Sequence, residues 1–259
     1  MPGWLTLLSM RVLLTFAVEA EFAPWRKLRG FEKIAKGKAQ FFRARIGNSE
    51  VSVLLTGVGG KHGWLEASKV IWDGEVDICI SSGLAGALRP EYHLGDVLAA
   101  KEVQIVGRQR VVPADTRLLR LAEEHGARAV DAFYTADHVM GLASEKRELA
   151  RLADAVEMES GNVLHELAAL GARGIAIRGI SDRADQDLPL DFNRVMTSAG
   201  EVSIPRVLGE MVRHPLSTRA LVRFGNQSRV AAEKLVAFLD RYVEAVASSM
   251  GTIIGAVAR

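Results

Sequence analysis

Apolar runs of strand length alternate with stretches of helical periodicity along the chain. Residues 11–18 form a first apolar run, and residues 19–28 follow it with helical spacing. Short apolar runs bounded by turn residues are typical of buried strands, whereas apolar positions three or four apart are typical of amphipathic helices. The same criteria predict strands at 76–88, 95–106 and 173–182, a strand and loop at 129–141, and helices at 61–74, 115–127, 144–155, 161–172 and from 192 to near the end.

Turn and capping residues mark the boundaries between these segments. Residues 39–59 read as a hairpin that turns at Gly47-Asn48 and continues into a strand ending in glycines. Asp115 and Ser144 stand at helix starts, where a side-chain oxygen can accept from free backbone amides. Gly171 is expected to end the helix before it.

This alternation predicts an α/β, three-layer fold with a central mixed, largely parallel twisted sheet flanked by helices. No repeat or linker divides the sequence. We therefore expect one domain over 1–259, with 1–9 as an upstream extension and 192–259 as a helical C-terminal tail packed on the domain. Ligands in such folds bind at the carboxyl ends of strands. Four residues lie at or just beyond such ends: Glu21, Ser82, Gly83 and Asp182.

Composition narrows the functional class. Lys and Arg number 33 against 31 Asp and Glu, and a formal net charge of +2 is too mild to imply nucleic acid. The one cysteine, Cys79, excludes an internal disulfide, and its apolar surroundings favour a buried thiol. The six histidines show no metal-binding spacing. We expect neither a metal nor a nucleic-acid partner.

The first 22 residues superficially resemble a signal peptide. Arg11 interrupts the apolar stretch, no basic segment precedes it, and no small-residue cleavage site follows. A membrane-spanning helix would need about 20 uninterrupted apolar residues, which this stretch lacks. The expected location is the cytoplasm.

Familiar cofactor motifs are incomplete. In the dinucleotide-binding pattern the sixth position is His62, and in the phosphate-binding loop pattern Leu55 replaces the first glycine. Ala169 takes the place of the second histidine in the zinc-protease motif. We therefore expect no cofactor.

Acidic residues reach the edges of the apolar core in three segments. Glu157 and Glu159 flank a methionine between a helical stretch and an apolar helix, Asp182 ends a buried strand, and Glu21 follows the first strand. Taken singly, each has an ordinary explanation, because acids favour helix N-termini and turns. Together they suggest a site that holds and cleaves a ligand.

In order along the chain, these segments resemble the superfamily of nucleoside phosphorylases and methylthioadenosine/S-adenosylhomocysteine nucleosidases. The likeness covers residues 11 to about 190 and includes a glycine-rich strand exit, G-x-A-G at 83–86, Gly95-Asp96, Met158-Glu159 and S-D-x-A-D at 181–185. The last two, at this separation, are the specific part. The resemblance implies the phosphorylase/hydrolase-like fold.

The resemblance also implies roles for individual residues. Glu159 would take the ribose hydroxyls, Met158 would pack on the sugar, and Asp182 would protonate N7 of a departing purine. Glu21 would activate water, with Glu19 as the alternative in register. An aromatic residue often stacks on the base where this chain has Val139, which leaves purine preference open. The substrate-binding set is Gly83, Val139, Met140, Glu157, Met158, Glu159 and Ser181.

The nucleophile can be water or phosphate. Phosphorylases of this superfamily bind phosphate with arginines in the first loop and before the central glycine, where this chain has residues 17–22 and Ser81. Leu84 replaces the usual serine or threonine, so phosphate would lack its fork-shaped donors. Water is the favoured nucleophile, and Arg178 or Arg89 could supply a phosphate site in the alternative.

Two further alternatives stay open. Residues 83–88 and the long tail also resemble the hopanoid-associated branch of the superfamily, whose substrate is adenosylhopane. The non-catalytic alternative is a sensor that binds a nucleoside without cleaving it. Relatives assemble so that a neighbouring subunit completes the 5′ pocket, so a homo-oligomer is expected. Residues 206–229 carry five arginines and one acid among apolar residues, typical of helices packed over the domain and also of a surface resting on anionic lipid.

Overall fold

The computed structural model describes residues 10–36, 39–59, 76–107, 111–195, 197 and 217–257. Its strands are β1 (Arg11–Phe16), β2 (Glu32–Lys36), β3 (Ala39–Ile46), β4 (Ser49–Leu55), β5 (Ile78–Ala87), β6 (Val97–Ile105), β7 (Val111–Pro113), β8 (Arg128–Thr135), β9 (Ala155–Glu157) and β10 (Arg173–Asp182). Its helices are α1 (Glu19–Arg29), α3 (Thr116–Glu124), α4 (Ala143–Leu149), α5 (Ser160–Ala169), α6 (Phe192–Val195) and α8 (Ser217–Val257).

One mixed sheet organises the described residues, in the order β10-β6-β8-β9-β5-β1-β4-β3-β2 with β7 paired to β6. Its central strands β4, β1, β5 and β10 run parallel, as do β6, β8 and β9. The pairings β2–β3, β3–β4, β5–β9, β6–β7 and β6–β10 are antiparallel. An additional pairing of β10 with β5 closes β5, β10, β6, β8 and β9 into a five-strand ring. The predicted fold class is confirmed.

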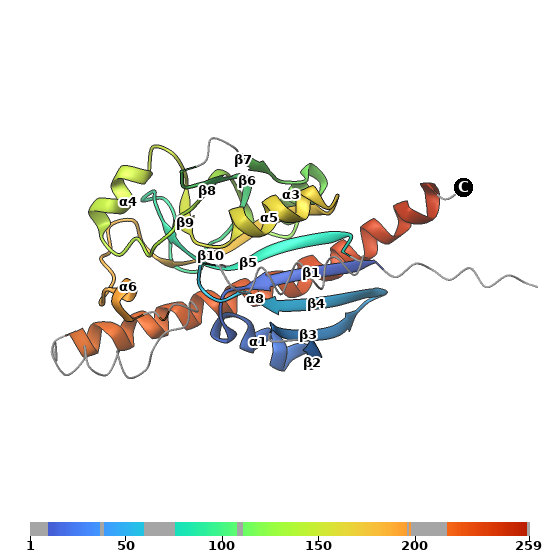
Figure 1. Cartoon of the computed structure of the whole chain (residues 1–259), viewed down its shortest axis with the longest axis horizontal. Helices are drawn as coiled ribbons and strands as arrows, with labels where there is room; N and C mark the ends of the chain where they lie inside the picture. Colours follow the sequence, from blue (N-terminus) through green and yellow to red (C-terminus); the bar gives the residue numbers. More distant parts are fainter. Residues whose placement is uncertain are drawn as a thin grey trace, which may run out of the picture.

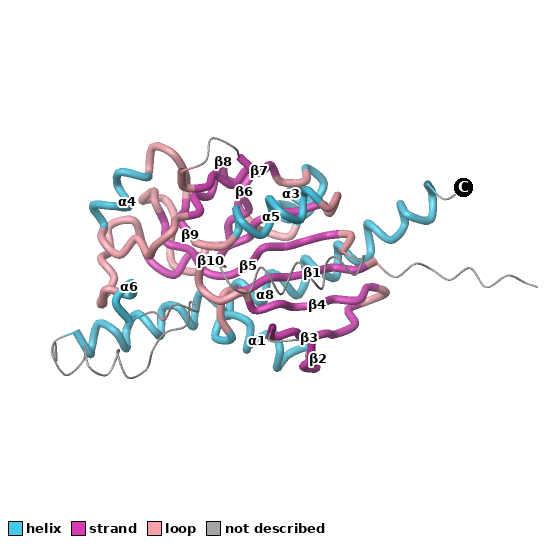
Figure 2. Tube along the Cα trace, viewed as in Figure 1, coloured by secondary structure: helices cyan, strands magenta, loops and turns pink. Residues whose placement is uncertain are grey.

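Both faces of the central strands are covered by helices, as Figures 1 and 2 show. Alternation along the strands directs Leu14 and Ile80 to one apolar cluster and Leu13 and Cys79 to the other. Buried residues of α1, α3 and α8 complete the first cluster, and buried residues of α5 complete the second. Period-two patterning therefore produces the three layers.

The long helix α8 packs on β10 and on α1. Asp240 accepts hydrogen bonds from Trp25 Nε1 (2.9 Å) and from Arg29 Nε (2.5 Å). Leu235 and Tyr242 of α8 are fully buried. The described helices include none that is both long and apolar enough to cross a membrane.

Several predicted boundaries need correction. Ser144 does not cap α4, because the helix begins one residue earlier and Leu142 occupies the N-cap position, with its amide bonded to Glu145 Oε2 (3.0 Å). The helix predicted to run to residue 155 ends at Leu149. Ser82 and Gly83 lie inside β5 rather than at its end, since the strand continues through its glycines to Ala87.

Other predicted boundaries agree with the structure. Asp115 Oδ1 accepts from the amides of Arg117 and Leu118, as an N-cap should. The hairpin turns at Gly47-Asn48, and the amide of Gly171 bonds the carbonyl of Ala168 just after α5. The predicted helix at 61–74, the extension at 1–9 and most of the segment between α6 and α8 lie outside the described residues.

Candidate active site

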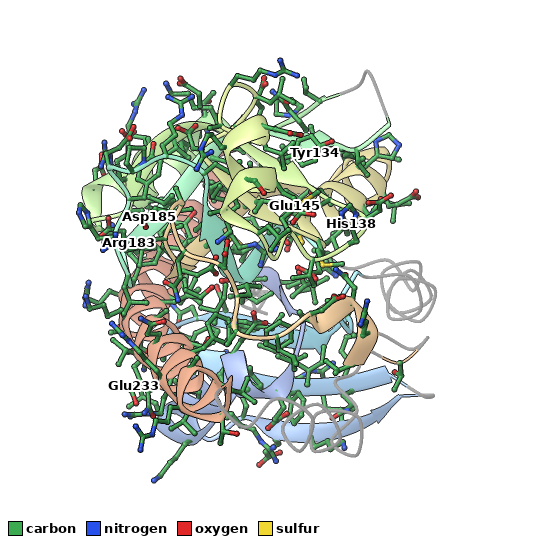
Figure 3. All side chains as sticks on the ribbon, turned by 90° about the vertical axis from the view of Figure 1, so that its left-hand side faces the viewer. Tyr134, His138, Glu145, Arg183, Asp185 and Glu233 are labelled. Atoms are coloured by element: carbon green, nitrogen blue, oxygen red, sulfur yellow. The ribbon has the colours of Figure 1, made fainter. Side chains whose placement is uncertain are left out.

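A cavity of about 1020 Å³ lies at the carboxyl ends of the central strands, and Figure 3 labels two of its lining residues, His138 and Glu233. The ends of the central strands form its floor, and α1, α8 and the loop after β8 form its walls. His138 of that loop and Glu233 of α8 lie on its opposite sides. The predicted site residues that line it are Glu21, Val139, Met140, Glu157, Met158, Glu159, Ser181 and Asp182.

Asp182 ends β10 with its side chain almost fully buried. Ser181 Oγ donates to its Oδ1 (2.7 Å), and Lys146 Nζ donates to its Oδ2. The carboxyl is further confined by Gly86, at which an added Cβ would lie 2.9 Å from Oδ2. Asp182 therefore has a fixed orientation at the cavity wall.

Lys146 is a site residue that the sequence analysis missed. It lies on α4 within a run of alternating charges, a pattern that favours a solvent-exposed face. Its side chain is nevertheless fully buried, and its ammonium also bonds the carbonyl oxygens of Arg183 (3.1 Å) and Gln186 (3.0 Å). The sequence holds no local signal for this placement, because the acceptors come from residues 36 or more positions away.

Glu157 and Glu159 stand where β9 leads into α5. Oε2 of Glu157 accepts from the amides of Glu159 (3.0 Å) and Ser160 (2.7 Å) and from Arg178, and its Oε1 accepts from Thr135. These contacts use the acceptor sites of a carboxylate. A direct contact of Glu157 with substrate thus stays a prediction.

Glu159 is less fully engaged. Its Oε1 accepts from the amide of Gly59 (3.0 Å), and its Oε2 lies 3.5 Å from Arg178 Nη2. Burial raises the pKa of Glu159 to about 7, the negative charges of Glu157 and Glu21 add to this, and Arg178 opposes it. Glu159 therefore changes charge near neutral pH.

Arg178 lies at the centre of the acidic residues and is fully buried. Its Nη2 bonds Glu157 and also Ser160 Oγ (2.8 Å). Its Nε and Nη1 have no hydrogen-bond partner among the described residues. Both nitrogen atoms are fully buried and Arg178 does not line the cavity, so its positive charge acts on the site through the neighbouring carboxylates of Glu157, Glu159 and Glu21.

Glu21 enters the site from the first turn of α1. Its Oε2 accepts from the amides of Ala17 (2.9 Å) and Val18 (3.3 Å), and its Oε1 accepts from the amide of Leu84 (2.9 Å). Burial raises the pKa of Glu21 above its ordinary value, and the Leu84 amide and Arg178 only partly offset this. Such a carboxylate binds a proton more readily than an exposed one does.

Gly83 does not line the cavity but lies directly behind it. A Cβ at this position would lie 2.6 Å from Arg178 Nη1 and 3.0 Å from Glu21 Oε1. On the other side of the cavity, Val139 is fastened to Asn193, which accepts from its amide (2.8 Å) and donates to its carbonyl oxygen (3.0 Å). Arg89 pairs with Asp154, outside the lining of the cavity.

Solved structures with this arrangement of strands include enzymes named for acting on nucleosides. The 5′-methylthioadenosine/S-adenosylhomocysteine nucleosidase of Helicobacter pylori is 22% identical, with a TM-score of 0.70 over 92% of this chain and 99% of that one. Futalosine hydrolase of Helicobacter pylori is 21% identical, with a TM-score of 0.71 over 92% and 99%. The Neisseria meningitidis nucleosidase is 17% identical, with a TM-score of 0.68 over 91% and 99%.

The family match and the fold together place the chain among enzymes of the nucleosidase or nucleoside phosphorylase class. The family described as the Phosphorylase superfamily matches residues 11–208, and the chain belongs to it. The resemblance inferred from the sequence is confirmed.

Proposed function

We propose that the protein cleaves the N-glycosidic bond of a purine nucleoside, with adenine as the base and water as the nucleophile. The observation that carries this proposal is that Asp182 and Glu159 line one cavity together with Glu21 and with Val139 and Met140 of the loop after β8, called the base-binding loop below. Cleavage of this bond needs a proton at the leaving base and negative charge near the sugar, whose transition state resembles an oxocarbenium ion. The three carboxyl groups supply both.

Each group has one task in this scheme. The base lies between Val139 and Met140 and the carboxyl of Asp182, which gives its proton to N7. Ionised Glu159 accepts hydrogen bonds from the ribose hydroxyls, and Met158 packs on the sugar. As C1′–N9 breaks, its electron pair leaves with the purine, and the proton on N7 makes the departing base neutral.

Glu21 lines the place of the nucleophile, and the buried charge of Arg178 lies near its carboxylate. Glu21 takes a proton from water as the water oxygen bonds to C1′. A general base is most effective when its pKa lies near the operating pH. Burial raises the pKa of Glu21 above that of an exposed carboxylate and so brings it closer to neutral pH.

Water is favoured over phosphate by the charges around Arg178. This one guanidinium is influenced by Glu157, Glu159 and Glu21. A phosphate dianion placed there would meet more negative than positive charge, and phosphate sites ordinarily present several cationic donors. A phosphorylase remains the second candidate because the family to which the chain belongs is described as the Phosphorylase superfamily.

The size of the cavity bears on the 5′ substituent. Its volume of about 1020 Å³ is at the upper end of the range of roughly 300–1,000 Å³ for small-molecule sites. Ala20, Pro24, Phe224 and Ala232 extend an apolar wall between α1 and α8. Such a wall suits a nucleoside with a large apolar 5′ group, and adenosylhopane is the candidate of this kind.

The test is incubation of the protein with adenosine, 5′-methylthioadenosine and an adenosine bearing a long 5′-alkyl chain, with and without phosphate. Free adenine together with free ribose-type sugar in both buffers is the expected result. Formation of a sugar 1-phosphate only with phosphate would establish the phosphorylase instead. Binding of these nucleosides without any release of adenine would establish the non-catalytic sensor. Light scattering of the same samples measures whether the protein forms the expected homo-oligomer.

A further inference from the structure

Lys146 places a buried positive charge beside Asp182. The proposed reaction assigns no task to this charge. The side chain is fully buried and donates to Asp182 Oδ2 and to the carbonyl oxygens of Arg183 and Gln186. An ammonium has three N–H donors, and all three have acceptors here. The group is therefore held as a cation against the acid.

Anchoring of the segment after β10 does not by itself explain why a lysine is buried at position 146. The segment after β10 is already fastened to the base-binding loop by the amide of Leu188 on the carbonyl of Gly141 (2.8 Å). The amide of Ala143 adds a bond to Asp187 Oδ1 (2.7 Å). A neutral hydrogen-bond donor at position 146 would serve the two carbonyl oxygens without the cost of burying a charge.

We propose that Lys146 is a positioning residue for departure of the base, stabilising the carboxylate that Asp182 becomes when it protonates N7. The inference rests on the proposed function. In the step, the O–H bond of Asp182 breaks, an N7–H bond forms, the C1′–N9 electron pair goes to the purine, and Asp182 is left negative. Lys146 keeps its own protons throughout.

The contribution of Lys146 is greatest after the proton has moved. A neutral carboxyl group gains only a hydrogen bond from the ammonium, whereas the carboxylate gains an ion pair in surroundings that exclude water. An interaction that strengthens along the reaction lowers the barrier rather than merely tightening substrate binding. Loss of Lys146 should therefore reduce kcat more than it changes KM.

A leaving group that departs without a proton should not need Lys146. The 4-nitrophenolate ion is stable enough to leave unprotonated, so 4-nitrophenyl β-D-ribofuranoside is the probe that bypasses Asp182. 5′-Methylthioadenosine is the probe that requires it. A purely structural role of Lys146 would affect both substrates equally.

The experiment measures kcat and KM of Lys146→Met on both probes, with Lys101→Met as the matched control, since Lys101 pairs with Asp131 on the surface (2.8 Å). We expect kcat on 5′-methylthioadenosine to fall about 10- to 100-fold, part of the 10²–10⁴-fold typical of general acid catalysis. We expect less than about a threefold change on the nitrophenyl riboside and none for Lys101→Met.

The double variant Asp182→Asn/Lys146→Met gives a second readout on 5′-methylthioadenosine alone. If Lys146 acts through Asp182, the second substitution costs no further activity. Lys146→Gln replaces Lys146→Met in both measurements should the methionine variant not fold. Equal losses on the two probes, or additive losses in the double variant, would overturn the proposal. Absence of nucleoside cleavage by the unmodified protein would instead refute the proposed function.

Discussion

Arg178 of β10 and Gly83 of β5 are paired in register, and the guanidinium of the first occupies the space that a side chain on the second would need. An added Cβ would lie 2.6 Å from Arg178 Nη1, closer than real Cβ atoms approach their neighbours. The cation at the centre of the site thus depends on a glycine in the adjacent strand.

We therefore predict that Gly83→Ala displaces Arg178 or Glu21. Misplacement of reacting groups by about 1 Å can cost about 10²-fold in rate. Overpacking of a buried site should also lower the free energy of unfolding by about 1–3 kcal/mol. Steady-state kinetics and thermal unfolding measure the two effects. Gly141→Ala is the control, since nothing lies within 4 Å of its added Cβ; a similar loss in both variants would contradict the explanation.

Asp182→Asn keeps the size of the side chain but removes the transferable proton. We expect turnover of purine nucleosides to fall about 10²-fold or more, within the range of general acid catalysis, with folding intact. Asp185→Asn is the matched control, because Asp185, three positions after Asp182, forms an exposed ion pair with Arg183 (Figure 3). Unchanged turnover of Asp182→Asn would remove Asp182 from the mechanism.

Glu159→Gln should weaken ribonucleosides far more than their 2′-deoxy analogues. The carboxylate accepts from two hydroxyls, and the amide can accept at only one of its two terminal atoms. The measurement is kcat/KM for adenosine and for 2′-deoxyadenosine in both proteins. Equal losses on the two substrates would mean that Glu159 only stabilises the start of α5.

The pH dependence of the enzyme should report on the same residue. Because burial raises the pKa of Glu159 from 4.5 to about 7, the side chain is neutral at pH 6 and ionised at pH 8. The hydroxyl-binding form is the ionised one, so kcat/KM for ribonucleosides should rise as the pH passes through about 7. This acidic limb should be absent from Glu159→Gln.

Stability should vary in the opposite direction. The folded protein holds the Glu159 proton more tightly than the unfolded chain does, so between pH 4.5 and about 7 it binds more protons. The contribution of Glu159 to the free energy of unfolding is therefore largest below pH 4.5 and is lost as the pH rises through 7. Denaturant unfolding of wild type and Glu159→Gln across this range isolates it; a difference that does not change with pH would refute the assignment.

The sequence predicts those parts of the fold that depend on local patterns within a single strand or helix. Apolar runs such as 173–182 produced strands because they are buried on both faces, and Asp115 capped its helix through bonds to the next turn. Ser144 failed as a cap because Glu145 bonds the amide of Leu142 and begins the helix earlier. The ring of five strands depends on pairing between β5 and β10, which no local pattern specifies.

The acids of the candidate site were predicted from motif order, whereas their partners were not. Glu159 and Asp182 stand in short recognisable segments. The sequence indicates Arg178 only as an alternative phosphate ligand and gives no signal for Lys146. Both are charged residues in fully buried positions, a placement that tertiary contacts decide and composition disfavours.

A basic surface at the start of α8 remains a hypothesis. Arg219 and Arg223 are exposed there, as is Val222 with 59% of its surface accessible, while Arg206 and Arg213 lie outside the described residues. If this surface rests on anionic lipid, the protein should sediment with anionic but not neutral liposomes at low salt, and less at moderate salt.

Replacement of Arg219 and Arg223 by Gln should then weaken liposome binding about 30-fold, from about 1 kcal/mol for each cation. Protein that stays in the supernatant with anionic liposomes at low salt would exclude the lipid hypothesis. A soluble nucleoside would then be the better choice of substrate.

The groups that would break the bond and the apolar wall of the cavity come largely from different elements of the fold. The acids and the arginine come from β10, from the junction of β9 with α5 and from the first turn of α1, whereas Phe224, Gly225 and Ala232 come from α8. Substitutions along one face of α8 can therefore reshape the room beside the sugar without disturbing the groups that break the bond. Under the proposed function, descendants of such a chain could exchange one nucleoside for another while retaining the same chemistry.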